Sequence, residues 1–127
     1  MTPLLEYALF VKEVVPQVFG VDLLGVHNLV SMVSPDPQQI GLTLHQDTLV
    51  VAVLAADGDH TLLIKHRNSD WLYSVRLRIL PEHGQAFIQI VEAEFPALVR
   101  PYPALNEYAL LLDGVGIGSA YLNSNPL

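Results

Sequence analysis

The apolar stretch LVVAVLAA, residues Leu49–Ala56, decides the fold because it contains no polar side chain. A strand that faces water on one side alternates apolar and polar residues. An unbroken apolar run of this length instead indicates a strand that is covered on both faces. We therefore predict that Leu49–Ala56 forms a central β-strand.

Runs with the composition of strands surround this stretch, and residues typical of turns separate them. The predicted strands are Gly25–Val33, Ile40–His45, Thr48–Ala55, His60–Arg67, Asp70–Leu80 and Ala86–Phe95. The predicted separators are Ser34–Pro37, Gln46-Asp47, Asp57-Gly58, Asn68-Ser69 and Pro81–Gly84. Because connections this short do not allow a crossover, the runs should pair as an antiparallel meander.

Both ends of the chain show the spacing of a helix. In Thr2–Val15, apolar residues recur at helical intervals and Pro3 suits the first turn. The same spacing recurs in Leu105–Leu112, and Gly114 lies just past its end. Val115–Leu122 is predicted as a final strand.

These patterns predict one α+β domain spanning residues 1–127. An antiparallel meander of five to seven strands should carry an N-terminal helix and a C-terminal helix packed on it. The predicted core residues are Leu9, Val15, Leu49, Val51, Val53, Leu62, Ile64, Trp71, Val75, Leu77, Phe87 and Val91.

Four of the six basic residues fall within one predicted hairpin, and they are Lys65, Arg67, Arg76 and Arg78. A two-residue turn at Asn68-Ser69 would place Lys65 opposite Leu72, which puts all four cations on one face. Arginines at this spacing could bind carboxylate or phosphate groups, so the face is a candidate patch for an anion or an acidic partner.

The alternative is a solvated face whose charges are balanced within the chain. If Pro81–Gly84 is a four-residue loop, Glu92 and Glu94 share the face with the cations and neutralise them. We favour this interpretation from the sequence, because exposed cross-strand charge pairs are ordinary.

No motif of catalysis or cofactor binding is found in the sequence. The glycines of Asp113–Gly118 follow a predicted helix, whereas a phosphate-binding loop follows a strand and opens a helix. The histidines lack the spacing of a metal site, and these are His27, His45, His60, His66 and His83. With no cysteine in the chain, no thiolate site or Cys–His pair can form. We expect no cofactor and no metal, and we favour a protein without enzymatic activity over an enzyme.

The composition points to a protein that buries surface against other chains. Charged residues make up 15% of the chain, against about 25% in a typical soluble domain. The net charge of −7 disfavours binding to nucleic acid or to an anionic membrane. No stretch is long enough to span a bilayer, and no signal peptide is evident, so we expect a cytoplasmic protein or one inside a virus-like particle assembled in the cytoplasm.

The sequence therefore predicts a non-catalytic structural or interaction protein that works in a homo-oligomer or a larger assembly, such as a component of a phage particle or of a bacterial assembly. Its partners would be copies of itself or other protein subunits. The predicted interface residues come from the first helix and the tail, and they are Leu4, Ala8, Val11, Ile117, Tyr121 and Leu122. One alternative is a protein or enzyme that binds a small anionic ligand in an apolar cavity between sheet and helices. An acidic mimic of nucleic acid is a weaker alternative, because the acidic residues are spread along the chain.

Overall fold

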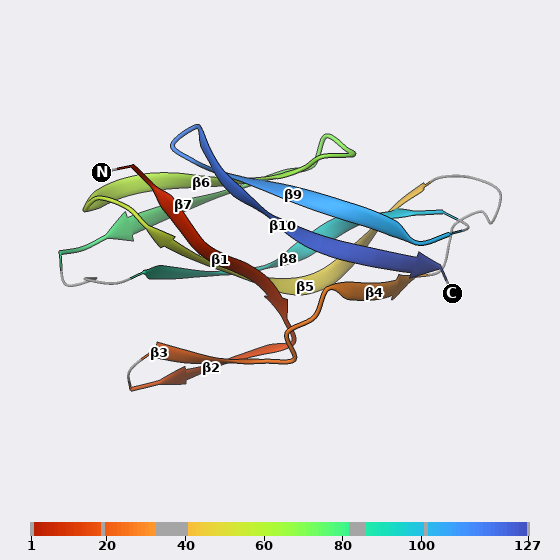
Figure 1. Ribbon diagram of the computed structural model, residues 1–127, viewed down its shortest axis with the longest axis horizontal. Helices are drawn as coiled ribbons and strands as arrows, with labels where there is room; N and C mark the ends of the chain where they lie inside the picture. The colour runs from red at the N-terminus through yellow and green to blue at the C-terminus, as the bar shows by residue number, and fades with distance from the viewer. Residues whose placement is uncertain (1, 19, 33–40, 82–85, 101, 127) are drawn as a thin grey trace.

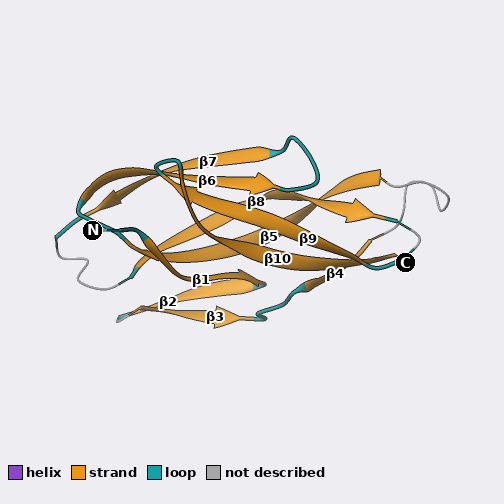
Figure 2. Cartoon of the chain, turned by 45° about the horizontal axis from the view of Figure 1, so that its top comes forward, coloured by secondary structure: helices purple, strands orange, loops and turns teal. Residues whose placement is uncertain are grey.

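The computed structural model of the protein describes residues 2–18, 20–32, 41–81, 86–100 and 102–126. Every regular element in these ranges is a β-strand (Figure 2). The strands are β1 (Leu4–Val11), β2 (Glu13–Gln17), β3 (Gly20–Leu24), β4 (Leu29–Met32), β5 (Gly41–Leu54), β6 (Gly58–His66), β7 (Leu72–Ile79), β8 (Phe87–Val99), β9 (Ala104–Leu112) and β10 (Val115–Pro126). The fold is all-β, and the prediction of an α+β domain is wrong.

Two sheets enclose one hydrophobic core. The five-stranded sheet has the order β4-β10-β9-β6-β7, and the three-stranded sheet has the order β1-β5-β8. Strands β2 and β3 form a separate hairpin that lies beyond the three-stranded sheet, on the side away from the five-stranded sheet (Figure 1). Among the described strands, β4 and β10 form the one parallel pair.

The central strand predicted from the sequence is confirmed. Residues 49–53 of β5 are each at most 1% exposed. Leu49, Val51 and Val53 belong to the core between the two sheets. Val50 and Ala52 alternate with them, so they point to the opposite side of β5, and they too are fully buried. The unbroken apolar run therefore reflects a strand with cover on both faces.

The β6–β7 hairpin is also confirmed in its register, because Lys65 lies opposite Leu72. Seven of the predicted core residues are buried in the core cluster, namely Leu49, Val51, Val53, Leu62, Ile64, Leu77 and Val91. Trp71, Val75 and Phe87 are partly buried against it. Leu9 and Val15 lie outside the cluster, and their prediction as core residues is wrong.

The predicted N-terminal helix consists of β1 and β2 instead. Strand β1 pairs with β5, and the register shifts between Leu5 and Tyr7. An extra residue at such a bulge breaks the two-residue alternation of a strand. Of the intervals that predicted a helix, only Leu4–Ala8 spans this bulge; Ala8 and Val11 lie on opposite faces of β1, and Val15 belongs to β2, so the helical spacing marks no single face.

The predicted helix Leu105–Leu112 belongs to β9, where burial alternates strictly from residue to residue. The side chains that point inward are Ala104, Asn106, Tyr108, Leu110 and Leu112, all buried. The sequence of β9 does not show this alternation, because Asn106 is polar but points inward and several of the outward-pointing residues are apolar. Asp113 and Gly114 both have positive φ, 52° and 81°, and form the turn between β9 and β10.

The antiparallel meander is wrong in its connectivity. The chain leaves the three-stranded sheet after β5 and enters the five-stranded sheet with β6, passing through Asp57-Gly58. Strand β8 then returns to pair with β5 along its whole length. Gln46-Asp47, predicted as a turn, lies inside β5. The predicted loop Ser34–Pro37 and most of the predicted loop Pro81–Gly84 lie outside the described residues.

A buried polar network joins the two sheets, with Asn106 at its centre. Asn106 Oδ1 accepts hydrogen bonds from His66 Nε2, at 3.0 Å, and from the backbone N–H of Leu98, at 2.7 Å. Asn106 Nδ2 donates to the Leu122 carbonyl, at 3.1 Å, and to Ser124 Oγ, at 3.3 Å. All four hydrogen-bonding positions of the amide are therefore occupied.

Two neighbouring side chains extend this connection to β8. The Tyr108 hydroxyl donates to the Pro96 carbonyl at 2.6 Å, and Ser124 Oγ donates to the Leu98 carbonyl. Because β8 is an edge strand of the three-stranded sheet, these contacts satisfy backbone groups that have no partner strand. Burial raises the pKa of Tyr108, and the Asp47 charge adds to the effect, so the hydroxyl stays protonated and continues to donate.

We predict that Asn106→Ala lowers the free energy of unfolding by about 3 kcal/mol, because leaving a buried donor or acceptor unsatisfied costs about 1–3 kcal/mol. Urea denaturation measures the change. The control is Asn123→Ala, which removes an amide from the outward face of β10 and should change stability by less than about 0.5 kcal/mol. Equal losses in the two variants would contradict the role given to Asn106.

We predict that deletion of Gly116–Leu127 unfolds the protein. Most of β10 would be lost, and with it the buried Ala120 and Leu122 and the hydrogen bonds of β9 along that side. Loss of chemical-shift dispersion in an NMR spectrum reports this outcome, and Tyr121→Ser, which alters an exposed side chain of the same strand, should keep the dispersion. A deletion variant that stays folded would show that β10 is an accessory strand.

Candidate functional site

The four predicted cations lie together on the outer face of the five-stranded sheet. Lys65, Arg67, Arg76 and Arg78 are all exposed. Their neighbours Leu62, Ile64 and Leu77 point into the core, so the cations point away from it. We call this part of the sheet, carried by β6, β7 and the residue after β6, the basic face.

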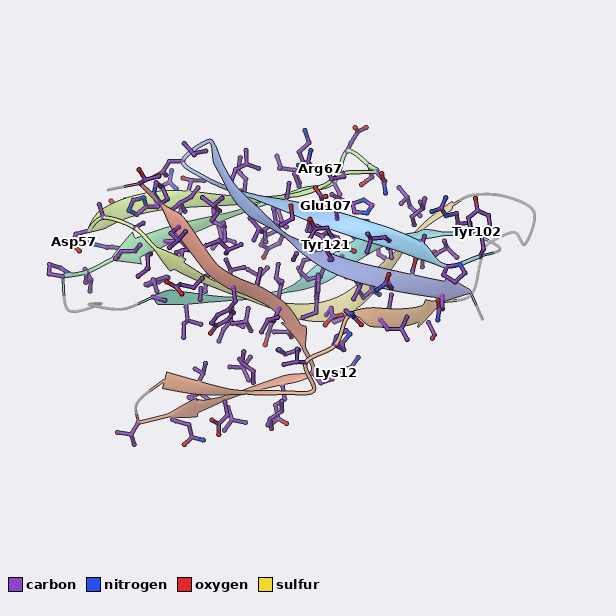
Figure 3. All side chains as sticks on the ribbon, in the orientation of Figure 1. Lys12, Asp57, Arg67, Tyr102, Glu107 and Tyr121 are labelled. Atoms are coloured by element: carbon purple, nitrogen blue, oxygen red, sulfur yellow. The ribbon has the colours of Figure 1, made fainter. Side chains whose placement is uncertain are left out.

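Two of these cations have carboxylate partners. The Arg67 guanidinium forms an ion pair with Glu107 of β9, and the two residues lie beside Tyr121 of β10 (Figure 3). Arg78 Nε lies 4.0 Å from Asp59 Oδ1, and both side chains are largely exposed. Within the described residues, Lys65 and Arg76 form no ion pair. The basic face therefore keeps unbalanced positive charge.

Among the depressions that border the basic face, two are lined by its cations in pairs. One, of about 560 Å³, has Lys65 and Arg67 on one side and Gly116, Gly118 and Ser119 of β10 on the other. Gly116 has no atom within 4 Å of the position that a Cβ would occupy, which leaves this side open. The second depression, of about 420 Å³, lies between Asp59 and the two arginines of β7. Both are open to solvent, and neither is the predicted cavity between sheet and helices.

The predicted balance of the basic face by Glu92 and Glu94 is wrong. Both glutamates lie on β8, which pairs with β5 in the three-stranded sheet, opposite Thr48 and Gln46. Their side chains are exposed on the outer face of that sheet. The two sheets enclose the core between them, so their outer faces point in opposite directions. The glutamates and the cations are therefore on opposite sides of the protein.

The predicted interface residues divide into exposed and buried ones. Leu4 and Tyr121 are 56% and 50% exposed. Val11 and Leu122 are fully buried within the chain itself, and Ala8 and Ile117 are partly buried against the core. Only Leu4 and Tyr121 of this set therefore present a large apolar surface to a partner.

Tyr121 belongs to an apolar patch that the sequence did not reveal. Leu29 of β4 and Leu105 of β9 both lie opposite Asn123 of β10, two residues beyond Tyr121. Leu29 and Leu105 are each about half exposed. We call Leu29, Leu105 and Tyr121 the apolar patch, and it lies on the same outer face as the basic residues.

A buried cluster of two histidines and an aspartate was also missed. Asp47 Oδ1 lies 3.1 Å from His27 Nε2, and Asp47 Oδ2 lies 3.5 Å from His45 Nε2. Because the predicted turn at Gln46-Asp47 is continuous strand, His45 and Asp47 point inward from the same face of β5. If residues 45–47 had been predicted as a strand, His45 and Asp47 would have been expected side by side on one face.

Burial alone would raise the pKa of Asp47, but the neighbouring His45, the Thr48 N–H and His27 outweigh it and hold that pKa below its ordinary value. The carboxylate stays ionised and fixes the connection between β3 and β4 against β5. A depression lined in part by Phe10, His27 and Tyr121 reaches this cluster from outside.

A second histidine–aspartate pair closes the end of the five-stranded sheet. His60 Nδ1 lies 2.6 Å from Asp113 Oδ2, and His60 Nε2 lies 2.6 Å from the Ala56 carbonyl. These hydrogen bonds, the one to Ala56 foremost, raise the pKa of His60 above its ordinary value. The Thr61 N–H, and then His60, lower the pKa of Asp113. The contacts hold the crossing from β5 to β6 beside the β9–β10 turn.

In the part of the chain that the structure describes, no three histidine or acidic side chains form a group that could hold a metal ion. No helix long and apolar enough to span a membrane occurs there either. His83 lies outside the described residues.

Comparison of the chain with family models, with curated proteins and with solved structures finds no match. The geometry of the surface therefore carries the functional argument.

We predict that the pKa of His60 lies above that of an ordinary histidine and that the pKa of His66 lies below it. The pKa of His60 is raised, whereas burial lowers the pKa of His66. Stability from the His60 pairing is fully present below pH 6.5 and disappears as pH rises through the raised pKa. The stabilisation of wild type over His60→Asn should accordingly be larger at pH 5.5 than at pH 9. NMR titration and urea denaturation measure these two effects, and a difference independent of pH would contradict the ion pair.

Proposed function

We propose that this protein is a non-catalytic building block that assembles with copies of itself. The observation that carries the proposal is the amount of apolar surface that the folded chain leaves in water. Thirteen large apolar side chains of the described residues are at least 37% exposed. Single exposed apolar residues are normal, but three of these, Leu29, Leu105 and Tyr121, share one face of three adjacent strands, and an exposed apolar patch marks an interaction site.

The apolar patch on the outer face of the five-stranded sheet is the best candidate for the contact. Its three members come from three adjacent strands, and the central position between them is Asn123. Strands of a sheet are rigid supports, so the patch is presented without any ordering of a loop. Aromatic and aliphatic side chains surrounded by polar residues are typical of the centre of an interface.

Two further properties support an assembly protein over a ligand-binding one. The space between the two sheets is filled by the core cluster, and the depressions at the surface are open to solvent. The chain also has no cysteine, which suits a subunit that assembles in the reducing cytoplasm. Larger particles built from such subunits would need several interfaces on each copy.

We predict that the purified protein has a native mass that is a multiple of 14.0 kDa, and that Leu105→Ser with Tyr121→Ser lowers this mass. Loss of two half-exposed apolar side chains at an interface should weaken association by at least about tenfold. Light scattering after size-exclusion chromatography gives the mass.

The control is Val18→Ser, which removes an apolar side chain that is 89% exposed at the tip of the β2–β3 hairpin, outside the patch. It should leave the mass unchanged. A wild-type protein that is monomeric at high micromolar concentration would refute self-assembly and favour a small ligand at the depression beside His27.

A further inference from the structure

We propose that the copies join head to tail, with the basic face of one copy bound to the exposed part of the outer face of the three-stranded sheet of the next, which carries Glu92, Glu94, Leu42 and Leu44 and lies beside the covered Val50 and Ala52. This inference rests on the proposed function and names its partner and its geometry. The occupant of the basic face is a second copy of this chain, recognised by an acidic surface centred on Glu92 and Glu94.

Charge is divided between the two sheets. Strands β1, β5 and β8 contain no lysine or arginine, and their exposed acidic residues are Glu6, Glu92 and Glu94. The basic face holds four of the six lysines and arginines of a chain whose net charge is −7. The other two are Lys12 and Arg100, which lie outside the three strands. The protein therefore has one positive and one negative outer face.

The charges at the centre of each face have no ion-pair partner among the residues that the structure describes. Lys65 and Arg76 form no ion pair with any described residue, and the same holds for Glu92 and Glu94. Intramolecular neutralisation is excluded by the topology, because the two faces are separated by the core. A second copy supplies the complementary charge at a matching spacing, because Arg76 and Arg78, like Glu92 and Glu94, are two residues apart on one strand.

Each face also carries apolar surface beside its charges. The apolar patch borders the basic residues, since Tyr121 lies opposite Glu107, the partner of Arg67. On the other sheet, Leu42 and Leu44 of β5 are about half exposed on the same outer face as the glutamates. Apolar contact supplies affinity, and the charges determine which faces meet.

A twofold contact between two basic faces would place arginine against arginine, which is unfavourable. Contact between unlike faces is heterologous, and repetition of one such contact generates a ring if it closes and a filament if it does not. The two faces point in opposite directions, so each copy can bind one neighbour on either side.

The test reverses the charge of each face separately. The basic-face variant carries Arg76→Glu and Arg78→Glu, and the acidic-face variant carries Glu92→Lys and Glu94→Lys. All four side chains are exposed, so folding should be retained, and circular dichroism with thermal unfolding verifies this. Sedimentation velocity measures association at low and at high salt.

Each variant alone should associate at least tenfold more weakly than wild type, since both of its outer faces then have the same sign. An equimolar mixture of the two variants should associate again, and so should the fourfold variant that exchanges the charges of the faces. Wild-type association should weaken at high salt, because exposed charges are screened. The control Asp57→Lys lies in the crossing from β5 to β6, outside both charged centres, changes net charge half as much as the acidic-face variant and should associate like wild type.

The outcomes separate this inference from the proposed function. Normal association of either variant alone overturns the head-to-tail contact and leaves self-assembly standing. Failure of the mixture and of the fourfold variant overturns the pairing of these two faces. A wild-type chain that is monomeric in every condition overturns both.

Discussion

The arrangement of the two sheets depends on the hydrogen bonds of the Asn106 side-chain amide, whose four hydrogen-bonding positions are all occupied. Apolar contact alone lets two sheets slide over one another, because the hydrophobic effect has no direction. The amide fixes their relative position, since it donates within the five-stranded sheet and accepts from the backbone of β8 in the other sheet. His66 completes it from β6, and its lowered pKa keeps the ring neutral. A fully satisfied buried network of this kind specifies one packing, and the positions of both outer faces follow from it.

The parts of the fold that local sequence determines could be predicted. An unbroken apolar run identified the centre of β5, and a two-residue turn fixed the register of β6 against β7. The parts that depend on distant partners could not. Asp57-Gly58 and Asp113-Gly114 carry the same signal, yet the first joins strands of different sheets and the second joins paired neighbours. The difference lies in which strands are available to pair, and no short window of sequence contains that information.

The candidate site shows the same division. Alternation along β6 and β7 placed the cations on one face, because both strands and their turn are contiguous in sequence. Where Glu92 and Glu94 lie depends on the sheet that β8 joins, which the sequence did not reveal. Asp47 was assigned to a turn because Gln46-Asp47 separates two strand-like runs with residues typical of turns. The buried position of Asp47 is possible because His27 and His45 contact its carboxylate. His27 comes from a distant segment of the chain, so its contact with Asp47 depends on the tertiary structure.

The pairing of β10 with β4 has a consequence for synthesis of the protein. Strand β4 lies in the first third of the chain, and its described partner strand ends at Pro126. While the ribosome is still translating, β4 and the outer edge of β9 have no partner, and their apolar side chains remain in water. Contacts between residues so far apart in sequence form late and slowly, which exposes the nascent chain to aggregation. The edge that β10 covers in the folded protein is therefore the part of the nascent chain most exposed to aggregation.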